Sequence, residues 1–225
     1  MTFSIVARCE ETGQFGVAIS SSSPAVAARC AWVRPGVGAV ATQNVTNPAL
    51  GDRVLDLLAA GEGPAAAVAA ARDGDAHPDY RQLLAVDGSG ATAIHSGPRA
   101  LGVWSEAAGR NCASGGNLLA DAGVPAAMVA GFEGATGSLG DRLTAALQAG
   151  LAAGGEAGPV RSAGLLIAGT QSWPYVDLRI DWLDEGCPIA ALARAWEVYR
   201  PQADDYVTRA LNPVAAPSYG VPGDR

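Results

Sequence analysis

Hydrophobic and polar residues alternate in two short segments at the start of the chain. Residues 2–8 place Phe3 and Ile5 on one face, and residues 15–21 repeat the alternation. A period of two residues is typical of a β-strand with one buried face. The polar segment between them contains Gly13 and predicts a turn. We therefore expect an N-terminal β-hairpin.

Similar patterns predict the remaining elements. Apolar or alternating segments predict strands over residues 36–43, 81–87, 91–95, 111–114, 162–168 and 175–182. Helical spacing predicts helices over residues 50–60, 64–72, 125–133, 139–153 and 188–200, the last resuming over 203–211. Residues 25–30 predict a short helical or irregular crossing. The glycine-rich segment 154–159 predicts a flexible break.

This order of elements favours an α+β fold. Strand pairs alternate with helix pairs, which suggests antiparallel sheets with helices packed outside them. The sequence contains no repeat and no linker that divides it. We therefore expect one domain over residues 1–211, followed by a C-terminal proline-rich tail over residues 212–225.

The composition removes whole classes of chemistry, because all 15 positively charged residues are arginines and there is no lysine. A Schiff-base enzyme needs a lysine amine, so pyridoxal-phosphate catalysis and imine-forming aldolases are excluded. A P-loop and a Ser-Lys hydrolase also need a lysine. The α-amine of the N-terminus is the amine that remains to act as a base.

Charge and hydropathy limit the partners. The net charge is −7 and the arginines form no cluster, so we expect no nucleic-acid partner. The apolar segments are too short to cross a membrane, and the N-terminus lacks the features of a signal peptide. We therefore expect a cytoplasmic protein without a membrane partner. We also consider a homodimer.

The residues that bind metals or react with oxidants are sparse. The four cysteines are widely spaced, and the two histidines are His77 and His95. We therefore expect reduced thiols and neither a zinc site nor a cofactor. His95 ends a predicted strand, where a lone histidine usually has a structural role; the alternative is a substrate contact.

Four consecutive serines end the second predicted strand, over residues 20–23. They are either an ordinary polar strand end or part of a site, because strand ends on rigid scaffolds often carry function. In the second interpretation Ser21 and Ser22 contact the substrate.

Charged residues alternate along the last predicted strand and place Asp177, Arg179 and Asp181 on one face. One interpretation is a solvated face. The other is a substrate clamp in which Arg179, beside Asp177, binds a carboxylate, which suits the bidentate guanidinium. The two aspartates also allow a site for a hard cation.

Thr2 stands directly after the initiator methionine, at the start of the first predicted strand. Removal of Met1 would leave a free α-amine and a hydroxyl in one residue. A free α-amine titrates near pH 7.7–8.0, so a large share is neutral at cellular pH and acts as a base. A threonine with its own amine is a known activated nucleophile.

Several segments together resemble the family called domain of unknown function 1028. The resemblance is carried by residues 2–8, 11–13, 16–20, 36–43, 55–61, 95–97, 116–119 and 177–181. It extends over about residues 2–200. One departure is Gly115, where the family usually has a glutamine.

The resemblance implies an N-terminal nucleophile hydrolase with a four-layer αββα sandwich of two antiparallel sheets. It implies hydrolysis of a non-peptide amide bond in a small molecule, linear or cyclic, with Thr2 as the nucleophile. Asn117 and Asn44 are the candidate donors to the oxyanion, and Gln43 is grouped with the substrate-binding residues.

Two other functions remain open on the sequence. One is a non-catalytic small-molecule-binding protein on the same fold. The other is a metal-dependent hydrolase that uses Asp177 and Asp181. Replacement of Thr2 separates them, because only the first hypothesis needs its hydroxyl.

Overall fold

The N-terminal hairpin lies at the centre of the larger of two antiparallel β-sheets. The computed structural model describes residues 1–222, and the last residues of the expected tail, 223–225, lie outside the described residues. The strand order of the larger sheet is β10-β9-β2-β1-β8-β7. β1 (Thr2–Arg8) pairs with β2 (Phe15–Ser21), so the predicted hairpin is confirmed.

Within residues 1–222, eight further strands complete the two sheets. The larger sheet also contains β7 (Ser105–Gly109), β8 (Cys112–Asn117), β9 (Ser162–Ala168) and β10 (Pro174–Ile180). The smaller sheet consists of β3 (Ala31–Arg34), β4 (Gly38–Asn44), β5 (Arg81–Asp87) and β6 (Thr92–Ser96), in that order.

The helices are α1 (Val26–Cys30), α2 (Ala49–Ala59), α3 (Pro64–Asp73), α4 (Val124–Gly134), α5 (Leu139–Ala152), α6 (Pro188–Tyr199) and α7 (Ala203–Leu211). Short 3-10 segments lie at Pro78–Tyr80 and Arg200–Gln202. Within the part of the chain that is described, no helix is both long and apolar enough to cross a membrane.

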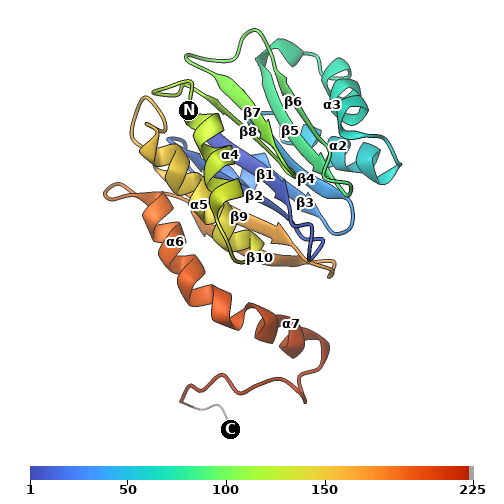
Figure 1. Cartoon of the computed structure of the whole chain (residues 1–225), viewed down its shortest axis with the longest axis vertical. Helices are drawn as coiled ribbons and strands as arrows, with labels where there is room; N and C mark the ends of the chain where they lie inside the picture. Colours follow the sequence, from blue (N-terminus) through green and yellow to red (C-terminus); the bar gives the residue numbers. More distant parts are fainter. Residues whose placement is uncertain (223–225) are drawn as a thin grey trace.

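The two sheets face each other, and helices cover the outer face of each (Figure 1). α4 packs on β7, β8 and β1 of the larger sheet, and α5 packs on β2, β1 and β9, with α6 against β9 and β10. α2 and α3 pack on β4, β5 and β6 of the smaller sheet. The layers are therefore helix, sheet, sheet and helix, which confirms the predicted four-layer αββα sandwich. α7 and residues 212–222 lead away from the sandwich (Figure 1).

Alternation along β1 divides its side chains between two cores. Phe3 and Ile5 lie in the core beneath α4 and α5, whereas Val6 lies in the core between the sheets. Burial of each of these large side chains stabilises the fold by about 2 kcal/mol. The same alternation directs Thr2 and Ser4 toward the second sheet, where Ser4 donates a hydrogen bond to Gln43.

Two strands were not predicted from the sequence. β3 has only four residues, and β7 consists of small and polar residues with little strand preference. Both lie at the edge of a sheet and pair with one neighbour, β4 and β8 respectively. β3 and β7 form because they pair with these neighbours. The local sequence pattern of each segment does not indicate this pairing.

Close packing of α4 against α5 depends on Gly131. A Cβ atom there would meet the Cβ of Ala149 at 2.6 Å and the carbonyl oxygen of Ala145 at 3.3 Å. We therefore expect Gly131→Ala to lower the free energy of unfolding by about 1–3 kcal/mol, measured by urea denaturation, because the helices must separate.

Gly134 on the same helix is the matched control. A Cβ atom there has nothing within 4 Å, so Gly134→Ala gains helix propensity at no steric cost. Equal stabilities of the two variants would contradict the role of Gly131.

Candidate functional site

Thr2 begins a central strand of the larger sheet and is almost completely buried. Its Cα partners are Ser21 on β2 and Asn117 on β8. The Thr2 hydroxyl donates to the carbonyl oxygen of Met1 at 2.5 Å and lies 3.3 Å from the Ser21 hydroxyl. The structure therefore places the predicted nucleophile among other polar groups at one end of the sandwich.

The serines after β2 form a small hydroxyl cluster around Met1. The Ser21 hydroxyl donates to the Met1 carbonyl oxygen at 2.5 Å and lies 2.8 Å from the Ser23 hydroxyl. Two hydroxyls, those of Thr2 and Ser21, thus converge on one carbonyl oxygen. The backbone N–H of Ser22 donates a hydrogen bond to Oε2 of Glu156 at 2.9 Å.

Glu156 is a residue of this site that the sequence patterns did not indicate. It is 6% exposed, and its Oε1 has no hydrogen-bond partner among residues 1–222. Burial raises the pKa of its carboxyl to about 7, although the nearby ammonium of Met1 and the hydrogen bonds from Ser22 act in the opposite direction. This carboxyl therefore titrates in the physiological range.

The segment that carries Glu156 is an irregular connection between α5 and β9, where the sequence predicted a break, and it pairs with the residues after β8. Glu156 forms an antiparallel bridge with Leu119, directly after β8, and the Ala157 N–H donates to Leu118. Gly154 and Gly155 have φ of 118° and 60°, which glycine adopts without strain. Nothing local in the sequence indicated this pairing; the one signal was a lone acid in a segment of glycines and alanines.

Asn117 and Gln43 belong to a buried network between the sheets. Both direct amide hydrogens to Oε1 of Gln82 on β5, at 3.3 Å and 2.7 Å. Gln43 also accepts from the Ser4 hydroxyl at 2.6 Å. The sequence did not single out Gln82, which the fold places at the centre of this network.

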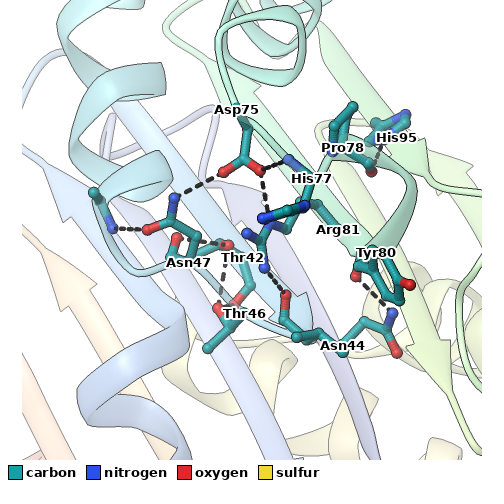
Figure 2. Close-up of polar contacts among 12 residues, drawn as sticks. Thr42, Asn44, Thr46, Asn47, Asp75, His77, Pro78, Tyr80, Arg81 and His95 are labelled. Atoms are coloured by element: carbon teal, nitrogen blue, oxygen red, sulfur yellow. Dashed lines mark hydrogen bonds and ion pairs between the residues drawn. The ribbon is translucent and has the colours of Figure 1, made fainter.

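Asn44 and His95 hold loops at this end of the smaller sheet (Figure 2). Asn44, with φ of 70°, donates to the Tyr80 carbonyl at 2.7 Å and accepts from the Leu101 N–H at 3.2 Å. His95 Nε2 lies 3.1 Å from the Pro78 carbonyl. Within residues 1–222 neither side chain shares a hydrogen bond with Thr2.

A buried ion pair ties the loop after α3 to β5. Asp75 accepts from Arg81 at 3.1 Å, and also from the side chain of Asn47 and the N–H of His77 (Figure 2). Burial raises the pKa of the Asp75 carboxyl, but the bonds from Asn47, His77 and Arg81 outweigh it and leave the pKa below its usual value. The carboxylate is therefore stabilised in the folded state.

The charged face of β10 lies apart from Thr2. Arg179 binds Asp181 through two hydrogen bonds of 3.0 and 2.9 Å, and Asp177 is exposed. β10 is separated from β1 by β9 and β2, which corresponds to about 14 Å across the sheet. Among the described residues no group of three or more His, Cys, Asp or Glu is placed to hold a metal ion.

A large cleft of about 1070 Å³ lies at the opposite end of β1 and is lined by Cys9, Glu10, Arg110, Glu133 and Arg142, among others. The length of β1, about 20 Å, separates this cleft from Thr2. It is not part of the site around the N-terminus.

The fold and the position of Thr2 define the class of protein. It is an α+β protein with a four-layer αββα sandwich of two antiparallel sheets, in which the second residue of the chain begins a central strand. The sequence model of the family of unknown function DUF1028 matches residues 2–192, and the chain belongs to this family.

A solved structure of the same family agrees with the family assignment. The chain is similar to the crystal structure of protein SPO2555 from Silicibacter pomeroyi, also of DUF1028, with 31% identity, 88% of each chain covered and a TM-score of 0.82. It is distantly similar to an Anbu Gly-1 mutant from Hyphomicrobium sp. strain MC1, with 13% identity, coverage of 91% and 96%, and a TM-score of 0.42. Anbu, described as an ancestral beta-subunit, from Yersinia bercovieri has 10% identity, coverage of 91% and 97%, and a TM-score of 0.38. No curated protein matches the chain.

Loss of the Asp75 carboxylate leaves Arg81 buried without its ionic partner. We expect Asp75→Ala to lower the free energy of unfolding at pH 7 by about 3 kcal/mol. Because the folded carboxyl has a lowered pKa, its contribution is present above the unfolded pKa near 3.9 and is lost as the pH falls through the folded value. Urea denaturation at pH 7 and pH 3 measures this difference.

Asp73 provides the control for this pair, because its ion pair with Arg72 is exposed to solvent. Asp73→Ala should leave stability unchanged. A loss at Asp75 that is the same at both pH values would show that packing, and not the charge, is responsible.

Glu156→Gln removes the cost of burying a charge. The folded pKa of about 7 lies above the unfolded value of 4.5, so wild-type stability falls as the pH rises between them. We expect wild type and variant to be equally stable at pH 4.5, and the variant to be more stable at pH 8 by on the order of 3 kcal/mol. Thermal unfolding at both pH values, with the N-terminus identified by intact mass, tests this. A variant that is less stable at pH 8 would contradict it.

Proposed function

We propose that this protein is an N-terminal nucleophile hydrolase that cleaves an amide bond of a small molecule, with Thr2 as the nucleophile after removal of Met1. The observation that carries the proposal is the Thr2 hydroxyl at the head of a central strand, beside the Ser21 hydroxyl and within 2.5 Å of a carbonyl oxygen. That carbonyl belongs to an amide, the bond between Met1 and Thr2. The site thus holds an amide carbonyl against the proposed nucleophile.

The first step transfers the hydroxyl proton of Thr2 to its own α-amine, through a water molecule. The amine serves as the base because the sequence has no lysine. The Thr2 oxygen then forms a bond to the carbonyl carbon of the substrate, and the carbonyl oxygen becomes an oxyanion.

Ser21 is the proposed donor to this oxyanion. Its hydroxyl donates at 2.5 Å to the carbonyl oxygen of Met1, so it reaches an oxygen at this position. One such donor contributes roughly 3 kcal/mol to transition-state stabilisation. Asn117, the strand partner of Thr2, is the second proposed donor through the amide hydrogen that is not directed to Gln82.

The carbon–nitrogen bond of the amide then breaks, and the leaving amine takes the proton held on the α-amine of Thr2. Water attacks the resulting ester and releases the acid, which restores the Thr2 hydroxyl. Asn44 is not assigned a catalytic role, because its amide donates to Tyr80.

The hypothesis of a metal-dependent hydrolase lacks a supporting observation, since Arg179 already binds Asp181 in a bidentate pair. A small-molecule-binding protein without catalysis remains the second candidate. It needs the same cluster around Thr2 but not the Thr2 hydroxyl.

Replacement of Thr2 tests the proposal. Thr2→Ala should abolish hydrolysis of a panel of small linear and cyclic amides, assayed by release of acid or amine, because it removes the nucleophile. Thr2→Ser keeps a hydroxyl and should retain measurable turnover. Alanine and serine at this position are both small, so Met1 can be removed from each variant.

Intact mass provides the control. Each preparation must lack Met1, since a retained methionine blocks the α-amine. Turnover by a chain that keeps Met1, or by Thr2→Ala, would contradict the proposal.

A further inference from the structure

Met1 occupies the acyl side of the amide bond that the Thr2 hydroxyl faces. Its carbonyl oxygen accepts hydrogen bonds of 2.5 Å from Thr2 and from Ser21. In the proposed reaction the acyl half of a substrate must bring its carbonyl to the same two hydroxyls. The surroundings of Met1 therefore describe the surroundings of that acyl half.

The side chain of Met1 packs over a glycine. A Cβ atom at Gly158 would lie 2.8 Å from the Met1 Cε and 3.3 Å from the Sδ. Gly158 does not have a positive φ, so its backbone accepts other residues and the constraint is one of space. The absence of a side chain at position 158 makes room for an unbranched apolar side chain of this length.

The third group of Met1 is its ammonium, whose positive charge acts on the buried carboxyl of Glu156. Glu156 is two residues from Gly158, and its Oε2 is held by the N–H of Ser22, the residue after Ser21. The Met1 ammonium is close enough to act electrostatically on the Glu156 carboxyl. Oε1 is buried and has no hydrogen-bond partner among the described residues.

A buried carboxylate oxygen without a partner is costly, and a cation that binds beside it removes part of that cost. The Met1 ammonium is the positive charge that acts on the Glu156 carboxyl and favours its ionised form. Once Met1 is removed, the ammonium of a substrate takes that place. The ion pair between the substrate ammonium and the Glu156 carboxylate, in a water-poor site, selects substrates that carry an ammonium.

Resting on the function proposed above, we propose that the substrate is an α-aminoacyl amide with an unbranched apolar side chain. Its carbonyl binds Ser21, its α-ammonium binds Glu156, and its side chain lies over Gly158. The amide nitrogen and its substituent point away from this pocket and are the leaving group.

The test compares three small amides on chain that starts at Thr2, verified by intact mass. L-Methioninamide carries all three groups, 4-(methylthio)butanamide lacks the ammonium, and glycinamide lacks the side chain. Ammonia release gives kcat/KM for each. We expect methioninamide to exceed each of the other two by at least about tenfold.

Two variants assign this selectivity to residues. Glu156→Gln should bring methioninamide and 4-(methylthio)butanamide to within about threefold of each other, by reducing the first and leaving the second. Gly158→Ala should raise KM for methioninamide and leave glycinamide unchanged, because the added methyl group fills space beneath the side chain. Glu62→Gln, at an exposed site in the turn after α2, is the matched control and should change none of the three.

Four outcomes would overturn the substrate class. In the first, wild type hydrolyses methioninamide and 4-(methylthio)butanamide equally. In the second, Glu156→Gln lowers kcat equally for both, which would place the carboxylate on the Thr2 amine. In the third, Thr2-dependent hydrolysis occurs only with other amides of the panel, which leaves the proposed function intact. In the fourth, no amide is hydrolysed, and the proposed function fails as well.

Discussion

A buried set of hydrogen bonds between the two sheets fixes the site around Thr2. The Ser4 hydroxyl on β1 donates to Gln43 on β4, and the Gln43 amide donates to Gln82 on β5. Asn117 on β8 donates to the same oxygen of Gln82. In a water-poor layer each polar group needs a partner, so a shift of one sheet against the other would leave several unsatisfied at once. The two sheets therefore have one favourable relative position. That position determines which side chains surround the first residue of β1.

Two buried carboxylates near this end of the sandwich illustrate opposite uses of charge. Asp75 accepts hydrogen bonds from Asn47, His77 and Arg81, and its ionised form is favoured in the folded protein. Glu156 has one oxygen held by Ser22 and one without a partner, and burial disfavours its ionised form. A fold that only stabilised itself would satisfy both. The oxygen of Glu156 without a partner fits the substrate contact proposed for this residue, because stability is commonly given up where a ligand must bind.

Local patterns predicted the parts of this fold that depend on periodicity. The β1–β2 hairpin and the helices could be recognised because each buries one face along a continuous segment. Thr2 was identified because its chemistry depends on its position in the sequence. β3, β7 and the role of Glu156 could not be recognised, since each depends on pairing with a distant segment: β4, β8 and Leu119. Asp177 and Arg179 lie on β10 as predicted, but Asp181 follows the end of this strand at Ile180. The ion pair between Arg179 and Asp181 and the distance of this face from Thr2 were not visible in the sequence, and the distance depends on the sheet order.

The absence of lysine acquires a structural meaning at the N-terminus. Because the sequence has no lysine, its one aliphatic amine is the α-amine of the first residue. With Met1 in place, that amine lies near Glu156 and the carbonyl of the same residue lies against Ser21. In the proposed mechanism, Met1 of the unprocessed chain occupies the site for the acyl half of the substrate. It also blocks the α-amine of Thr2, which is the catalytic base. Removal of one residue opens the site and creates the base together, and the contacts that held Met1 become the contacts that select the substrate.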